Sequence, residues 1–266
     1  MPNHRVFHMA SFSRSGETLM LRCLNAHPKI EVVHQILESD TAEDLALFNH
    51  LMERRETTIP GDHPLLAHRE MAPDAVLVVK NAVWIHAYPR VGFTLIRNPF
   101  SVIVSAHRHT EKKDHSPHRN QQMRWCKAID PIMLPYIKSG DIMDGYLALY
   151  VRKMLQDRRD GLPFLRYEDF VTDPATWLRR IVAHLGLDWS DRVMRSHEDY
   201  AEGEMGHGRI KLWRPVHANS KNRFKSALLP HQISRVYAFA HEVLAVYGYD
   251  WDGTEVALRP DVEGRL

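Results

Sequence analysis

Residues 5–24 read RVFHMASFSRSGETLMLRCL, and the expected architecture follows from them. Residues 5–10 are short and mostly apolar, which predicts a buried β-strand, and residues 18–24 are good helix formers. Between them lies a turn of small hydroxylated residues that also holds Arg14 and Gly16. Strand, polar turn and helix in direct succession predict an anion site, because turn N–H groups and the first helix amides converge on one point. The alternative is an ordinary connection with a surface arginine.

Composition limits the kind of protein this can be. The chain has 266 residues, of which 44% are hydrophobic and 26% charged, as expected for a globular protein with a substantial core. A formal charge of +2 does not favour nucleic acid as a partner. No run approaches 18 apolar residues, so we expect no membrane insertion and a cytoplasmic location. The clustered His107, His109, His115 and His118 lack a metal-binding spacing, and we expect no metal.

Further strands and helices alternate along the chain. Continuous apolar runs predict strands at residues 75–80, 92–96 and 163–167, and helices are predicted at residues 42–55, 100–109, 144–160, 174–185 and 230–247. Residues 57–73, 110–122 and 199–227 are expected to be irregular, the second of them as a mobile loop or lid. The pattern predicts an α/β fold: a single domain, residues 1–266, with a central parallel β-sheet flanked by helices.

Polar groups follow each predicted strand. Ligands of open parallel sheets bind at the carboxyl ends of the strands, so Arg14, Lys80 and Arg97 should face one crevice. Three cations predict a ligand with several negative charges, and we expect a phosphorylated nucleotide. The turn lacks the Gly-Lys-Ser/Thr ending of a Walker A loop, which disfavours an enzyme that hydrolyses ATP or GTP.

Four motifs in order resemble one family. Residues 13–19, SRSGETL, look like a 5′-phosphosulfate loop of the pattern [KR]-S-G-T-T-[LW], and residues 95–99, LIRNP, with Ser105 look like a 3′-phosphate motif. Two more motifs complete the series. One is LRYEDF at residues 165–170, and the other is KNRFK at residues 221–225, followed by a helix that ends in Tyr-Gly-Tyr. The chain thus resembles the sulfotransferases that use 3′-phosphoadenosine-5′-phosphosulfate (PAPS), whose fold is P-loop NTPase-like.

The resemblance implies an enzyme that transfers the sulfuryl group of PAPS to a hydroxyl acceptor by in-line displacement, without a metal. Arg14 would contact the 5′-phosphate and the bridging oxygen, and Arg97 with Ser105 would hold the 3′-phosphate. The other donor-binding residues that it implies are Ser15, Gly16, Glu17, Thr18 and Leu19 of the loop, Tyr167 at the adenine, and Lys221 and Arg223 over the 3′-phosphate.

The chain departs from the family in two places. Glu17 replaces the usual Thr, and its carboxylate must turn away from the phosphate or repel it. Lys80 keeps the catalytic lysine of a Lys-Thr-His motif, but Ala82 stands where the histidine would be. A base must take the acceptor proton, and we favour His34, then Glu38, then His86.

Other functions stay open at this point. An ATP-dependent small-molecule kinase of the same architecture would require Mg²⁺, and a non-catalytic nucleotide-binding protein would bind the bisphosphate and transfer nothing. The expected acceptor is a hydroxyl-bearing small molecule, saccharide or peptide, and both a monomer and a homodimer stay open.

Overall fold

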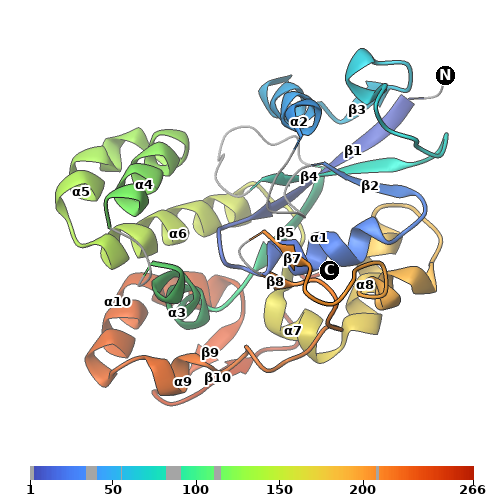
Figure 1. The fold of residues 1–266 in the computed structure, drawn as a ribbon. Helices are drawn as coiled ribbons and strands as arrows, with labels where there is room; N and C mark the ends of the chain where they lie inside the picture. The colour runs from blue at the N-terminus through green and yellow to red at the C-terminus, as the bar shows by residue number, and fades with distance from the viewer. Residues whose placement is uncertain (1–2, 34–40, 55, 82–90, 111–114, 208–209) are drawn as a thin grey trace.

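A parallel sheet with strand order β2-β4-β1-β5-β6 lies at the centre of the molecule (Figure 1). The structure is a computed structural model, and it describes residues 3–33, 41–54, 56–81, 91–110, 115–207 and 210–266, with the side chains of residues 107–110 and 115–118 left out. The five strands are β1 (Asn3–Ser11), β2 (Ile30–Val33), β4 (Val76–Asn81), β5 (Gly92–Ile96) and β6 (Phe164–Arg166).

Both faces of the sheet are buried, as the continuous apolar runs predict. In β4, Val76 and Val78 pack into a core with α1 (Glu17–Asn25), α7 (Tyr167–Thr172) and α8 (Pro174–His184). Leu77 and Val79 alternate with them and pack on the opposite face with α2 (Ala42–Arg54). A third core lies beside β5 and β6 and is built largely from α3 (Pro99–Thr110), α4 (His115–Ile129), α6 (Ile142–Arg159) and α10 (Pro230–Val246).

The remaining elements are short. They are β3 (Thr58–Pro60), which pairs with β1 antiparallel, α5 (Leu134–Ser139), α9 (Phe224–Ala227), the hairpins β7 (Met205–Gly206) with β8 (Ile210–Lys211) and β9 (Tyr249–Trp251) with β10 (Val256–Leu258), and the 3₁₀ turns Pro64–Leu66, Pro131–Met133 and Asp191–Arg195. None of the described helices has both the length and the apolar character needed to cross a bilayer.

The predicted α/β class and parallel sheet are confirmed. The structure also contains helices and strands that the sequence does not predict. Residues 110–122 were expected as a loop, yet α4 begins at His115, because the apolar residues that anchor it, such as Cys126 and Ile129, lie only in its second half. The strand β2 is not predicted, because its four residues are too few to give a periodic signal. Residues 57–73 and 199–227 hold the short strands β3, β7 and β8 inside otherwise irregular segments.

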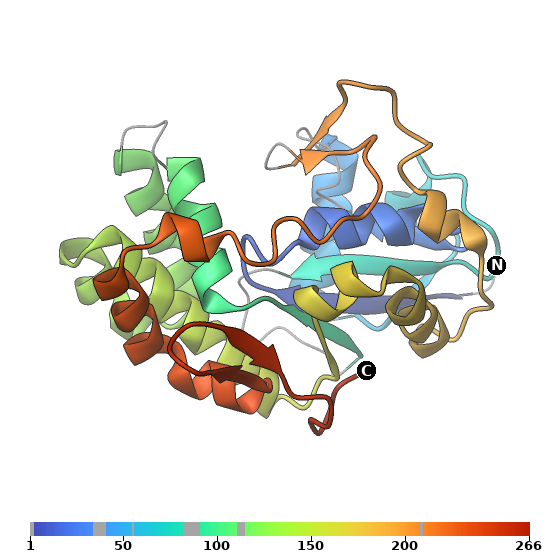
Figure 2. The same cartoon turned by 90° about the horizontal axis from the view of Figure 1, so that it is seen from below.

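The topology places a crevice at the carboxyl ends of β1 and β5. The chain leaves β1 toward β2 on one side, and it leaves β5 toward β6 on the other. Such a reversal of strand order is where ligands bind in open α/β sheets. The strap, which we define as residues 205–207 and 210–223, passes over α1 and reaches α9 beside α3 (Figure 2).

Candidate functional site

The turn after β1 has a backbone that favours anions. Arg14 and Gly16 have positive φ angles of 75° and 99°, and Gly16 caps α1. A Cβ at Gly16 would lie 2.3 Å from Cδ2 of Tyr167, so only glycine fits between the loop and that ring. The first helical hydrogen bond runs from Met20 N to Gly16 O, at 3.2 Å. The amides of residues 17–19 therefore precede the first helical bond and carry the positive end of the helix dipole.

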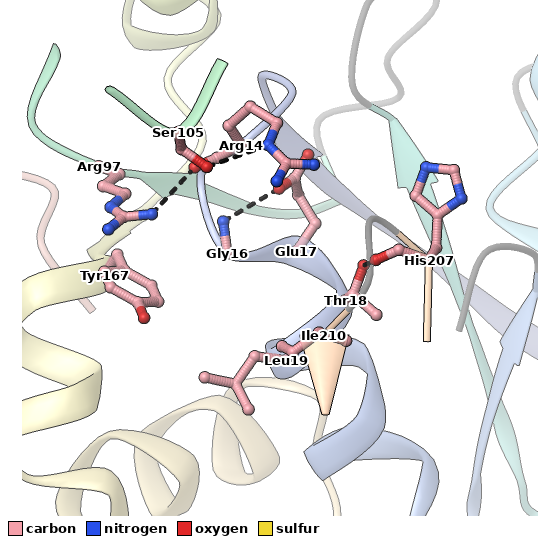
Figure 3. A pocket seen from close by; sticks show the side chains of 10 residues that line it. All are labelled: Arg14, Gly16, Glu17, Thr18, Leu19, Arg97, Ser105, Tyr167, His207 and Ile210. Carbon is pink, nitrogen blue, oxygen red and sulfur yellow. Dashed lines mark hydrogen bonds between the residues drawn. The ribbon is translucent and has the colours of Figure 1, made fainter. Parts of the chain in front are cut away.

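Arg97 joins the second motif to this turn. Its Nη1 donates to the carbonyl oxygen of Arg14 at 3.3 Å, and Arg14 Nε donates to Ser105 Oγ at 3.1 Å (Figure 3). The Arg97 guanidinium lies over the Tyr167 ring, with Cζ 4.4 Å from the ring centroid. Residues from three strand ends thus meet at one place, as the sequence predicts.

The segment after β5 holds Arg97 rigidly. Asn98 donates from its backbone N and from Nδ2 to Glu168 Oε1, at 3.1 and 2.5 Å, and its Oδ1 accepts from Ser101 N at 2.8 Å. Tyr150 donates to the carbonyl oxygen of Arg97 at 2.6 Å. These bonds fix the backbone on both sides of the guanidinium.

Two buried side-chain atoms in the site make no hydrogen bond to any part of the chain that the structure describes. They are Ser15 Oγ and Arg97 Nε. Buried polar atoms are normally paired, so an unpaired hydroxyl and an unpaired guanidinium nitrogen mark a place where a polar ligand would be stabilised. The backbone N of Ser15, predicted to face the phosphate, donates instead to Phe12 O at 3.2 Å.

Glu17 lies inside the site. Its Oε2 accepts from Gly16 N at 3.0 Å, and its Oε1 lies 3.8 Å from Lys80 Nζ, at the end of β4. Glu17 and Lys80 are each only 6% exposed. The carboxylate therefore accepts a hydrogen bond from a loop amide. From this position it would repel a phosphate, which is one of the two outcomes that the sequence leaves open.

The loop and the strap enclose a cavity of about 200 Å³. It is lined by Arg14, Gly16, Glu17, Thr18, Leu19, Arg97, Ser105 and Tyr167, all expected from the sequence, and by His207 and Ile210 (Figure 3). Thr18 Oγ1 donates to the carbonyl oxygen of His207 at 3.2 Å. The two strap residues carry no motif that could have identified them, because long-range contacts such as this one bring them to the loop.

Side chains of the core and of the site hold the strap by its carbonyl oxygens. The buried Arg22 donates from Nη1 to Leu212 O and Arg214 O at 2.8 and 2.7 Å. Arg97 Nη2 donates to Ser220 O at 3.0 Å. The strap is thus fastened near its middle and again beside the 3′-phosphate motif.

The remaining predicted residues are not gathered in the cavity. Lys221 Nζ donates to Thr172 Oγ1 at 3.1 Å, and Arg223 is exposed at the start of α9. His34, Glu38 and His86, the three candidate bases, lie outside the described residues. Among the described residues no group of three His, Cys, Asp or Glu side chains could hold a metal ion. The roles assigned to all these residues stay predictions.

Known proteins share the fold and part of the sequence pattern. Residues 85–191 match the model of a family described as the sulfotransferase family. The structure is similar to the sulfotransferase domain from the curacin biosynthetic pathway, with a TM-score of 0.57, 15% identity, and 91% of this chain and 98% of that chain covered. It is also similar to the mouse sulfotransferase SULT7A1 complexed with PAP, with a TM-score of 0.51, 12% identity, and 93% and 86% covered. No curated protein sequence matches the chain.

These likenesses confirm the predicted sulfotransferase resemblance and the P-loop-like fold. The matched segment includes Arg97, Ser105 and Tyr167, and it begins after the loop that carries Arg14. The assignment of the loop as a phosphate site therefore rests on its geometry rather than on the family match.

Proposed function

We propose that the protein is a sulfotransferase that takes PAPS as donor and transfers its sulfuryl group to a hydroxyl acceptor, without a metal. The observation that carries this proposal is the contact between two anion motifs from different strands, in which Arg97 donates to the Arg14 carbonyl and Arg14 donates to Ser105. A ligand with two phosphates, one at each motif, fits that arrangement better than a ligand with a single phosphate chain.

The residues present fit the donor. Ser15 Oγ and Arg97 Nε are buried and unpaired within the described residues, and both lie at the motifs that would receive phosphates. The backbone at Gly16 approaches Tyr167 so closely that no Cβ fits, which brings the aromatic ring next to the loop. The structural neighbour from mouse is complexed with PAP, which as 3′-phosphoadenosine-5′-phosphate would be the product of the proposed donor.

In this mechanism, PAPS supplies an activated sulfuryl group joined to its 5′-phosphate. Arg14 and the amides at the start of α1 stabilise the negative charge that grows on the 5′-phosphate side during transfer. Arg97 and Ser105 hold the 3′-phosphate, and Tyr167 lies beside the adenine. Lys80, at the end of β4, adds a third cation, on the side of the loop away from Arg97.

A base must remove the proton of the acceptor hydroxyl, and we propose His34 for this role, with Glu38 and His86 as alternatives. Replacement of His34 by Ala should leave PAP affinity unchanged and lower the turnover number at least about 100-fold, the low end of general-base contributions. Calorimetric titration with PAP and turnover with PAPS measure the two effects. Full activity in the variant would show that the base is another residue.

The proposed donor is tested by thermal stabilisation. PAP alone should raise the melting temperature, whereas ATP with Mg²⁺ should raise it less at the same concentration. Stabilisation by ATP with Mg²⁺ and none by PAP would refute the sulfotransferase and favour the kinase. Stabilisation by PAP without turnover on any phenol, alcohol, saccharide or tyrosyl peptide would favour the non-catalytic nucleotide-binding protein.

A further inference from the structure

The Glu17 carboxylate holds a position that the proposed 5′-phosphate would need. It accepts the Gly16 N–H at 3.0 Å, and that amide belongs to the turn expected to receive the phosphate. The side chains of Arg14 and Glu17 lie on the same side of the loop in Figure 3, and both line the cavity. A protein carboxylate therefore already lies among the loop amide, the start of α1 and Lys80.

We propose that Glu17 is the resident anion of the loop, and that the donor binds by displacing its carboxylate from the Gly16 amide toward Lys80. This inference rests on the proposed donor site. It assigns the Glu17 side chain a function of its own, which is to set the affinity of the loop for phosphate.

Competition follows from the geometry. One N–H group cannot donate a well-aligned hydrogen bond to two anions at once. A carboxylate that is 6% exposed is poorly screened by water, so it repels a phosphate placed beside it more strongly than a surface carboxylate would. Glu17 thus stabilises the free loop and weakens the bound state, and its removal should shift binding in one direction only.

Lys80 provides the place to which the carboxylate can move. Its Nζ lies 3.8 Å from Glu17 Oε1 in the free protein, so a small rotation of the Glu17 side chain keeps the ion pair while it releases the amide. A buried carboxylate that lost both partners would be strongly destabilised. The pair therefore lets Glu17 leave the amide and stay buried.

The experiment measures PAP affinity by calorimetry for Glu17→Gln and Glu17→Thr, with Glu43→Gln as the matched control. Glu43 is exposed in the first turn of α2, so its substitution changes the net charge equally and leaves the loop intact. We expect the two Glu17 variants to bind PAP about tenfold or more tightly than the wild type, because both remove the negative charge that competes with the phosphate for the Gly16 N–H. The control should bind as the wild type does.

The inference would be overturned if Glu17→Gln, with an unchanged circular dichroism spectrum, bound PAP no more tightly than the wild type does. The carboxylate would then be an ordinary helix cap. If neither the wild type nor the variants bind PAP, the proposed donor is wrong, and inorganic phosphate decides the remaining question. Phosphate should raise the melting temperature of Glu17→Gln more than that of the wild type if the carboxylate competes, and equal shifts would refute the competition.

A double-mutant cycle tests the part of Lys80. Lys80→Met should weaken PAP binding in the wild-type loop, because it leaves the displaced carboxylate without its cation, and should weaken it much less in Glu17→Thr. An equal loss in both backgrounds would show that Lys80 does not receive the carboxylate.

Discussion

Replacement of Arg97 by Ala should remove recognition of a 3′-phosphate and leave recognition of a 5′-phosphate in place. Arg97 is buried, and its guanidinium contacts the loop carbonyl of Arg14, the strap carbonyl of Ser220 and the face of Tyr167. Its Nε makes no hydrogen bond to the described residues. The guanidinium is thus held in position by the protein, and the Nε–H is among the donors left for a ligand.

The expected magnitude follows from that burial. Truncation of one partner in a buried, hydrogen-bonded charge pair costs about 2–5 kcal/mol. At about 1.36 kcal/mol for each factor of ten, PAP affinity should fall at least about 30-fold. Loss of the bond to Ser220 would loosen the strap as well, and that effect should weaken every nucleotide equally.

The assay separates the two effects by comparing PAP with adenosine 5′-monophosphate, which lacks the 3′-phosphate. The wild type should prefer PAP, and Arg97→Ala should bind the two nucleotides with nearly equal affinity. Arg54→Ala, at the exposed end of α2, serves as the control for net charge. If Arg97→Ala weakens both nucleotides by the same factor, Arg97 acts by holding the loop and strap, and its assignment to the 3′-phosphate is wrong.

Three further predictions concern the framework of the site. Gly16→Ala should lower the free energy of unfolding by at least about 1 kcal/mol, because a φ of 99° is strained for alanine and the new Cβ meets Tyr167. Urea unfolding measures this loss, and an unchanged unfolding midpoint would contradict the prediction. Arg22→Met should speed limited proteolysis of the strap about tenfold, because two carbonyl oxygens of the strap lose their buried donor. Equal cleavage rates in the variant and the wild type would show that other contacts hold the strap. Burial lowers the pKa of His8 below its usual 6.5, so the unfolded chain binds more protons than the folded protein in mildly acidic solution. The free energy of unfolding therefore falls as the pH falls through and below 6.5. Urea titrations from pH 7.5 to pH 5 should show a smaller loss of stability in His8→Gln than in the wild type.

The sequence predicts the site best where the sheet itself brings residues together. Arg14, Arg97 and Tyr167 lie far apart in the chain, yet each follows a parallel strand, and parallel strands end at one edge of a sheet. The rule about strand ends therefore places these three residues around one cavity. Lys80, which the same rule predicts at this crevice, lies beside Glu17 and is not among the residues that line the cavity.

Residues that depend on a long-range contact could not be placed in the same way. His207 lies at the cavity, where Thr18 donates to its carbonyl oxygen, and nothing in the local sequence indicates that bond. For the Glu17 carboxylate the sequence leaves two positions open, one turned away from the phosphate and one that repels it, and only the structure shows it at the Gly16 amide. The helix α4 was missed because its first half carries no apolar period.

The position of Arg97 depends on a carboxylate that touches no part of the cavity. Glu168 is 2% exposed; its Oε1 accepts from Asn98, and its Oε2 accepts from Tyr249 Oη at 2.8 Å. Burial first, and then the charge of Glu168, raise the pKa of Tyr249 well above its usual value, so this hydroxyl stays protonated and can donate. A buried carboxylate is tolerated only when such donors surround it.

This single group therefore ties together three motifs that are separate in the sequence: Arg-Asn-Pro, Tyr-Glu-Asp and the C-terminal Tyr-Gly-Tyr. The motifs that carry the family resemblance are accordingly of two kinds. Some of their residues line the cavity, and others, such as Glu168 and Tyr249, are explained by the need to hold Arg97 in place.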